Sequence, residues 1–274
     1  MDKTISMSQI IRRLKDELIQ RYYHFRIQTI ENPYRIRLRK QPYKILFLLG
    51  HMRSGSSLFT HILNSNPEII GYGETHLNYE SERDFNNLMF KVYWQIRDYQ
   101  MNHKYLLDKV LHNHKILDIN LLHSENLTSI FLIREPQITL ASILDIKPHF
   151  TEKKALYYYC ERLSMLEKYG KIINSKERSL LVSHDQLLNH TDSVFATLKT
   201  FLDTKEVFSE QYNILRTTGM KGIGDSSKNI KAGRIIRNPK KSENKISQDL
   251  VEKGMQSFNK CHSTLSEYCR TVEI

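Results

Sequence analysis

Hydrophobic and polar positions divide the chain into short apolar runs separated by longer amphipathic stretches. Three runs have the length and the polar boundaries of buried strands: residues 44–49, 129–133 and 179–183. Apolar residues recur at helical spacing in residues 58–63, 82–100, 105–114, 151–171 and 192–202, and a further helix is expected to begin at Pro136. Strands that alternate with helices pair in parallel. We therefore predict an α/β fold in three layers, in which helices flank a central, mostly parallel sheet.

The first 43 residues differ in pattern from residues 44–274, which we expect to form the α/β domain of one folded unit. Apolar residues at helical spacing, with arginines and lysines between them, predict a basic amphipathic helix from Ser8 to about Gln28. Two prolines and several basic residues indicate a connector over residues 32–42. Two interpretations of the helix are open: it packs on its own domain, or it makes peripheral contact with a membrane surface or an acidic partner.

The charge balance indicates an anionic partner. Lysine and arginine number 41 against 30 for aspartate and glutamate, a formal net charge of +11, and the 40% hydrophobic content excludes a disordered or fibrous chain. The three cysteines form no C-x-x-C motif, which argues against a disulfide framework or a cysteine-built zinc site and favours a reducing compartment. No apolar run reaches the roughly 18–20 residues that cross a bilayer, and no signal-like apolar core follows the N-terminus. We expect a cytoplasmic protein.

A glycine-containing loop follows the first expected strand. Residues 50–58 read Gly-His-Met-Arg-Ser-Gly-Ser-Ser-Leu, with Gly50 and Gly55 at the glycine positions of the pattern G-x-x-x-x-G-K-[ST]. Backbone amides of such a loop, together with the N-terminus of the next helix, bind an anion. Ser56 stands in place of the lysine that reaches the terminal phosphates of ATP or GTP, and the cation is Arg53 instead. The pattern favours a P-loop-like anion site over a site for a magnesium nucleoside triphosphate.

A second candidate anion site follows the second expected strand. Arg134 leaves the end of that strand, and Ser142 lies eight residues further on, in the helix that begins at Pro136. Ligands of open α/β sheets bind beyond the carboxyl ends of the strands, so Arg134 is expected to face the same crevice as the loop. A guanidinium and a hydroxyl suit a phosphate, whereas Arg134 taken alone is equally suited to an ion pair with Glu135 or Glu161. Two anion sites in one crevice indicate a ligand with anionic groups at both ends.

With these motifs the chain resembles the sulfotransferases that use 3′-phosphoadenosine 5′-phosphosulfate (PAPS), and their bacterial, Golgi and tyrosylprotein branches more than the cytosolic steroid and phenol branch. Residues 50–58 are similar to the family's 5′-phosphosulfate loop, and residues 131–136 with Ser142 are similar to its 3′-phosphate motif. Weaker similarities cover residues 181–188 with 198–202 and residues 220–225, the last resembling a lid over the nucleotide.

The resemblance implies a cosubstrate, PAPS, and no metal requirement. The residues that would bind PAPS are Arg53, Ser54, Gly55, Ser56, Ser57, Leu58, Arg134, Ser142, His184, Lys221 and Gly222. His184 replaces a tyrosine of the family pattern, and its imidazole is a candidate to stack on adenine. The lid contact to the 3′-phosphate is expected from Lys221 or Arg234.

The resemblance also implies the reaction. The sulfuryl group passes in line from PAPS to a hydroxyl or amine and leaves adenosine 3′,5′-bisphosphate, while Arg53 and the loop amides stabilise the charge on the leaving oxygen. Glu74 is expected to act as the general base, with His76 in reserve; the alternative role of Glu74 is a turn or helix-cap carboxylate. Residues 115–120 align with a family stretch that often contains an Asp-Lys pair, and Ile119 stands where the lysine would be.

Two other classes of function are kept as alternatives. A P-loop nucleotide or metabolite kinase shares the strand, loop and helix, but Ser56 replaces its lysine. A non-enzymatic binder of nucleic acid or of a membrane surface would use the positive charge but leaves the spacing of Arg53 and Arg134 unexplained. We expect a carbohydrate or small-metabolite acceptor, no nucleic-acid partner and no metal site, since histidine spacing typical of metal ligands is lacking. The sequence does not indicate an oligomeric state.

Overall fold

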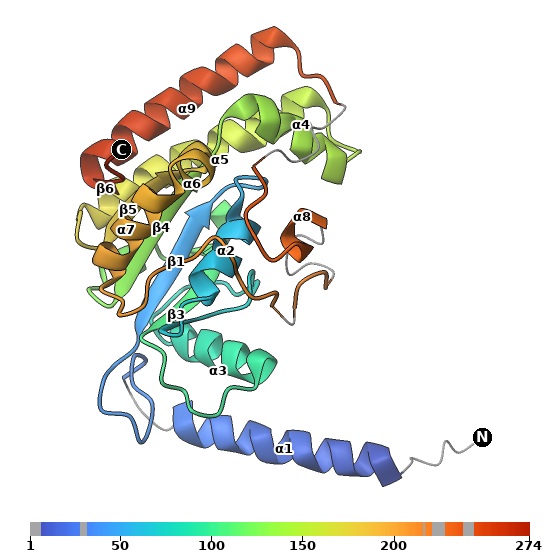
Figure 1. Ribbon diagram of the computed structural model, residues 1–274, viewed down its shortest axis with the longest axis vertical. Coiled ribbons are helices and arrows are strands. Elements are labelled where there is room, and N and C mark those ends of the chain that lie inside the picture. The colour runs from blue at the N-terminus through green and yellow to red at the C-terminus, as the bar shows by residue number, and fades with distance from the viewer. Residues whose placement is uncertain (1–6, 28–31, 216, 221–227, 238–243) are drawn as a thin grey trace.

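The computed structural model describes residues 7–27, 32–215, 217–220, 228–237 and 244–274. Within these residues the strands form one six-stranded sheet in the order β2-β3-β1-β4-β5-β6, and every neighbouring pair is parallel. Helices cover both faces of the sheet (Figure 1), which confirms the predicted three-layer α/β fold.

Three neighbouring inner strands of the sheet are the ones that the apolar runs at residues 44–49, 129–133 and 179–183 predict. The six strands are β1 (Lys44–Gly50), β2 (Ile69–Ile70), β3 (Tyr105–Val110), β4 (Leu127–Ile133), β5 (Ser179–Ser183) and β6 (Arg270–Thr271). All of β1 except Lys44 is buried, because β3 and β4 flank its edges and helices cover both of its faces. The outer strands β2 and β6 have two residues each, too few to show a period in the sequence.

The helices form two layers, one on each face of the sheet. Ile45, Phe47 and Leu49 of β1 share a core with α1 (Met7–Ile27), α3 (Asp84–Ile96), α4 (Pro136–Ile146), α5 (Glu152–Ile173) and α9 (Gln248–Tyr268). Leu46 and Leu48 point to the opposite face and share a core with α2 (Ser56–Asn64), α6 (His184–Asn189) and α7 (Thr191–Leu202). Shorter elements are η1 (Asn113–Lys115), η2 (Ile119–His123) and α8 (Lys228–Lys231).

The predicted helix over residues 105–114 is wrong, because these residues form a strand and a short 3₁₀ turn. β3 pairs with β1 from Lys44↔Tyr105 to Leu49↔Val110, and all six of its residues are buried. Asp108 and Lys109 interrupt its apolar run and resemble the polar positions of an amphipathic helix. Their charges are instead buried against partners distant in sequence, so tertiary contacts override the local pattern.

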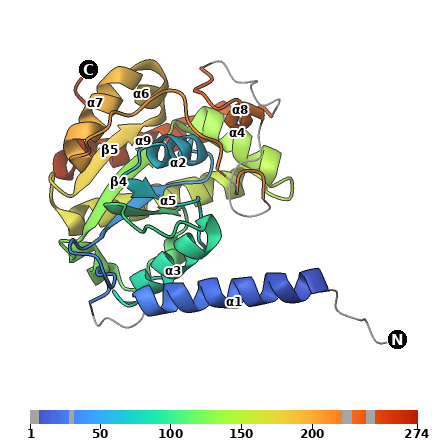
Figure 2. The same cartoon turned by 60° about the horizontal axis from the view of Figure 1, so that its bottom comes forward.

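The N-terminal segment is joined to the α/β domain at the C-terminal end of α1. Tyr23 and Ile27 are fully buried there, and Tyr34, Ile36 and Tyr43 of the connector belong to the same core. The view in Figure 2 shows α1 lying beside α3 and running outward along the side of the domain. The C-terminal half of the helix therefore packs on the domain, from the ion pair of Asp16 with Arg97 to Ile27.

Candidate functional site

The phosphate loop lies between β1 and α2 and depends on glycine for its shape. Gly55 has φ 92°, a left-handed conformation that favours glycine, and it caps the N-terminus of α2. A side chain there would also meet the His184 ring, since a Cβ would lie 2.3 Å from its Cδ2 atom. Ser56 and Ser57 form the first turn of α2, where backbone N–H groups have no partner within the helix. The loop therefore presents amide donors to an anion at the carboxyl end of β1.

His51 holds the loop from inside and is fully buried. Its Nδ1–H donates to the Met52 carbonyl at 2.9 Å, and its Nε2 accepts the Arg134 backbone N–H at 3.1 Å. Burial, followed by the charges of Arg162 and Arg134, lowers the pKa of His51 to about 4. The neutral imidazole thus connects the loop after β1 to the residue that follows β4.

The pH dependence of stability follows from this buried histidine. Because the unfolded chain takes up the His51 proton near pH 6.5 and the folded chain only near pH 4, the stabilisation is present above pH 6.5 and is lost as the pH falls towards 4. Urea unfolding at pH 7.5 and pH 5 should show a loss for the wild type about 2 kcal/mol greater than for His51→Gln. Equal losses in the two proteins would show that His51 does not titrate in this way.

Three of the predicted phosphate ligands lie together on the β4 side of the loop. Arg53 Nε donates to Ser142 Oγ at 2.7 Å, and Arg134 Nη1 donates to the Arg53 carbonyl at 3.2 Å. Arg53 has φ 65°, so the loop holds its backbone in the left-handed region. Residues from the ends of β1 and β4 and from α4 thus form one cationic cluster, which we call the arginine cluster (Arg53, Arg134 and Ser142).

Arg134 is a cation held in a buried position. Burial, followed by the neighbouring Arg53 charge, lowers its pKa to about 10, so it stays protonated at neutral pH. Its Nε is among the buried side-chain atoms of the described residues that have no hydrogen-bond partner. Its carbonyl accepts a hydrogen bond from the Tyr159 hydroxyl at 2.7 Å. A buried guanidinium with an unused donor fits an anionic ligand better than the alternative ion pair with Glu135 or Glu161.

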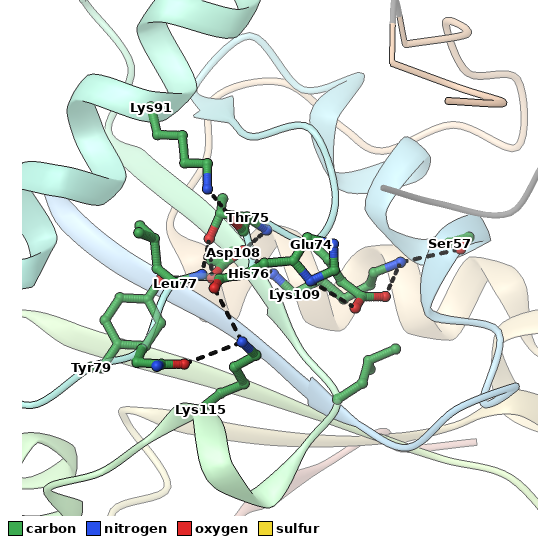
Figure 3. Close-up of polar contacts among 12 residues, drawn as sticks. Ser57, Glu74, Thr75, His76, Leu77, Tyr79, Lys91, Asp108, Lys109 and Lys115 are labelled. Atoms are coloured by element: carbon green, nitrogen blue, oxygen red, sulfur yellow. Dashed lines mark hydrogen bonds and ion pairs between the residues drawn. The ribbon is translucent and has the colours of Figure 1, made fainter. Parts of the chain in front are cut away.

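A second charged group lies on the β3 side of the loop (Figure 3). Lys109 Nζ lies 3.4 Å from Glu74 Oε1 and 3.3 Å from Ser57 Oγ, and the Lys109 side chain is only 2% exposed. His76 Nδ1 lies 3.9 Å from the other Glu74 oxygen, and the His76 side chain is 48% exposed. We call Lys109, Glu74 and Ser57 the lysine cluster. It links a partly exposed carboxylate to the first turn of α2.

Asp108 positions the segment that carries Glu74 (Figure 3). Its carboxylate accepts hydrogen bonds from the Thr75 amide at 3.0 Å, the Thr75 hydroxyl at 2.8 Å and the Tyr79 hydroxyl at 2.5 Å. Burial raises its pKa, and these donors oppose that rise. Gly71 permits the same segment to approach β3, because a Cβ there would lie 2.4 Å from the Leu107 carbonyl oxygen. The turn therefore has one defined path beside the sheet.

Arg162 of α5 fixes the strand ends beneath both clusters. It is 1% exposed, its Nε donates to the Gly50 carbonyl at 2.7 Å and its Nη2 donates to the Val110 carbonyl at 2.7 Å. Its Nη1 donates to Asn113 Oδ1 at 2.9 Å. One guanidinium thus joins the last residues of β1 and β3, from which the phosphate loop and the segment after Lys109 begin.

The structure places the other predicted site residues in several positions. Ser54 is fully buried beneath the loop, with its Oγ 3.0 Å from where a Gly50 Cβ would be, and Leu58 packs against the core around α2. His184 lies against Gly55, and burial together with the Arg134 charge lowers its pKa to about 3. The stacking of His184 on adenine stays a prediction.

The expected lid is described only in part, because Lys221 and Gly222 lie outside the described residues. The residues just before the lid lie against α2 and the turn before Glu74: Thr218 Oγ1 lies 2.7 Å from His61 Nε2, and Thr217 donates to the Tyr72 carbonyl at 3.0 Å. Arg234 lines a groove with Ser65, which follows the C-terminal end of α2. Arg234 thus lies by the end of α2 opposite the phosphate loop.

Three residues of the site were missed in the sequence: Asp108, Lys109 and Arg162. Ile119 begins a 3₁₀ helix, and an Asp-Lys pair lies at residues 108–109, on β3. That dipeptide was the available signal, and the helix assigned to residues 105–114 concealed it. Arg162 gave no signal, because an arginine inside a long helix is usually exposed.

Within the described residues, no group of three or more histidine, cysteine, aspartate or glutamate side chains could hold a metal ion. Of the helices in this part of the chain, none combines the length and the apolar character needed to cross a bilayer.

Comparisons with known proteins identify the fold. No family model matches the chain, and no curated protein matches it. Similar solved structures are the sulfotransferase domain from the curacin biosynthetic pathway and the sulfotransferase domain from the Synechococcus PCC 7002 olefin synthase, each with a TM-score of 0.50 and 16% sequence identity. The two alignments cover 83% and 84% of this chain, and 99% and 96% of those chains. The chain therefore has a sulfotransferase-like fold.

Proposed function

We propose that the chain is a PAPS-dependent sulfotransferase that transfers a sulfuryl group to a hydroxyl or amine acceptor. The observation that carries the proposal is the arrangement of cations on both sides of the phosphate loop. Arg53 and Arg134 lie on its β4 side, and Lys109 lies on its β3 side beside Glu74. A ligand with anionic groups at both ends fits this arrangement, because each end meets a separate cationic group at the carboxyl ends of parallel strands.

The donors of the site fit the two ends of PAPS. The arginine cluster would hold the 3′-phosphate through Arg134 and Ser142, in agreement with the buried, unpartnered Nε of Arg134. The loop amides and the first turn of α2 would hold the 5′-phosphosulfate, with the buried cation Lys109 next to Ser57. Neither group needs a metal ion to supply positive charge.

The lysine cluster then supplies the chemistry. Glu74 accepts the proton of the acceptor hydroxyl as the acceptor oxygen bonds to sulfur and the bond from sulfur to the 5′-phosphate oxygen breaks. The products are the sulfated acceptor and adenosine 3′,5′-bisphosphate, with one proton on Glu74. Lys109 and Arg53 stabilise the negative charge that develops on the leaving oxygen. Glu74 is partly exposed, which lets an acceptor reach it, and we propose a carbohydrate or small-metabolite hydroxyl.

The nucleotide end of the proposal is tested through Arg134. Arg134→Ala should lower the affinity for adenosine 3′,5′-bisphosphate about ten- to hundredfold in isothermal titration, because a charge-assisted contact to the 3′-phosphate is lost. Adenosine 5′-monophosphate lacks that phosphate, so the affinity of the variant for it should fall by less than about threefold.

Adenosine 5′-monophosphate also serves as the control for disturbance of the loop, since Arg134 contacts the Arg53 carbonyl. If the affinities for both nucleotides fall equally, Arg134 does not bind the 3′-phosphate. Arg178 provides the matched variant, because it too donates to backbone carbonyls, those of Leu122 and Ser124, at a position outside both clusters. Arg178→Ala should leave both affinities unchanged.

A further inference from the structure

Helix α1 presents apolar residues on the side that faces away from the domain. The residues buried in α1 are Tyr23, Arg26 and Ile27. A second row, spaced three, four or seven residues apart, lies on the opposite side of the helix. We call it the exposed stripe: Met7, Ile11, Leu14, Leu18 and Phe25. Figure 2 shows α1 along the outer side of the molecule, with its N-terminal part extending past α3.

The exposure of this row is high for large apolar side chains. Met7 is 73% exposed, Leu18 66% and Ile11 60%. Scattered apolar residues are common on protein surfaces, whereas several large apolar side chains gathered on one helix face mark an interaction site. Burial against the domain does not explain the row, because the packed side of α1 is formed by other residues.

The connector adds an apolar residue at the C-terminal end of the exposed stripe. Leu38 is 83% exposed, has φ 69° and lies between Arg37 and Arg39. The Arg37 guanidinium lies over the Phe25 ring, 4.4 Å from its centroid, and the Arg37 carbonyl accepts from Arg26 Nε at 2.8 Å. The connector therefore brings Leu38 and its basic neighbours to the last residue of the stripe.

The charge around the exposed stripe is positive. Helix α1 has four exposed basic residues, Arg12, Arg13, Lys15 and Arg21, against Asp16 and Glu17. Asp16 is paired with Arg97 of α3 at 2.8 Å, and Glu17 lies 3.6 Å from Arg13. The connector adds Arg35, Arg37, Arg39 and Lys40 and has no acidic residue. A row of apolar side chains with cations on both sides is complementary to an anionic lipid surface.

We propose that α1 binds in the plane of an anionic lipid bilayer, with the exposed stripe and Leu38 in the interface and the basic residues at the lipid head groups. Long basic side chains such as Arg21 suit this position, because their stems lie along apolar surface while the charge reaches the head groups. A second copy of the chain is a less suitable partner for the exposed stripe than an anionic bilayer. Pairing two exposed stripes would bring the basic residues of two helices and two connectors together.

Vesicle co-sedimentation of the full chain tests the proposal. The protein should bind phosphatidylcholine vesicles that contain about 30% phosphatidylserine, bind pure phosphatidylcholine vesicles at least tenfold more weakly, and dissociate as salt is raised. The affinity of the double variant Leu14→Ser/Leu18→Ser for the anionic vesicles should fall by about tenfold or more, because two interfacial side chains are lost.

The matched control removes two exposed apolar side chains elsewhere. Tyr157 is 69% exposed and Val207 is 67% exposed, so Tyr157→Ser/Val207→Ser should bind like the wild type. Absence of binding by the wild type, or equal binding by Leu14→Ser/Leu18→Ser, overturns the proposal. So does a wild-type dimer in light scattering that the Leu14→Ser/Leu18→Ser variant loses, since the stripe would then bind a second copy.

Discussion

Replacing Glu74 with glutamine should reduce turnover by about 10²- to 10⁴-fold, the usual contribution of a general base. Affinity for adenosine 3′,5′-bisphosphate should stay within about threefold of the wild type, because glutamine keeps an oxygen that can accept from Lys109, 3.4 Å away. The measurement is steady-state sulfuryl transfer from PAPS, combined with titration of the bisphosphate product. A loss in turnover without a loss in binding would place Glu74 in the chemical step.

His76→Gln is the control for this variant, because His76 lies on the same turn and 3.9 Å from Glu74. His76 is the more exposed of the two side chains, and its replacement should change turnover by less than about tenfold. If Glu74→Gln retains turnover and His76→Gln loses it, the histidine is the base. If both variants retain turnover, the acceptor proton leaves by another route and the role assigned to the lysine cluster is wrong.

Replacing Arg162 with methionine should lower the free energy of unfolding by about 3 kcal/mol, because it leaves two buried carbonyl oxygens and one partly buried amide oxygen without their donor. These are the Gly50 and Val110 carbonyls and Asn113 Oδ1, each within 2.9 Å of the guanidinium. Methionine fills much of the apolar volume, so the loss reports hydrogen bonding more than a cavity. Urea unfolding at pH 7.5 measures it.

Arg162→Lys keeps the charge but has one nitrogen in place of a planar fork, and should recover part of the loss. An additional result is expected in binding. Gly50 begins the phosphate loop, so Arg162→Met should also lower the affinity for the bisphosphate in conditions where the variant is fully folded. A stability within 1 kcal/mol of the wild type would contradict the role given to Arg162.

Much of the fold was predictable because its signals are local. β1, β4 and β5 are continuous apolar runs, and the glycines and serines of residues 50–57 are fixed by the geometry of one loop and one helix start. Arg134 and Ser142 could be placed in the same crevice, since parallel strands direct their carboxyl ends to one edge of the sheet.

The rest depended on contacts between distant parts of the chain. Lys109 is charged yet buried, because Glu74 and Ser57 reach it from other elements, and that pairing has no local signature. Arg162 differs from a surface arginine only through the carbonyls that surround it. For α1, the sequence showed an apolar stripe but not its direction, and the structure shows that Leu14 and Leu18 face away from the domain.

The most direct test of the proposed function is a thermal shift of the full chain with adenosine 3′,5′-bisphosphate, with ATP and magnesium, and with adenosine 5′-monophosphate. A ligand at about 100 times its Kd adds roughly 2.7 kcal/mol of stability. We predict stabilisation by the bisphosphate that exceeds that by the monophosphate and is unchanged by a chelator, because Arg134 and Lys109 supply the positive charge. If only ATP with magnesium stabilises the protein, the result contradicts the sulfotransferase assignment and favours a kinase.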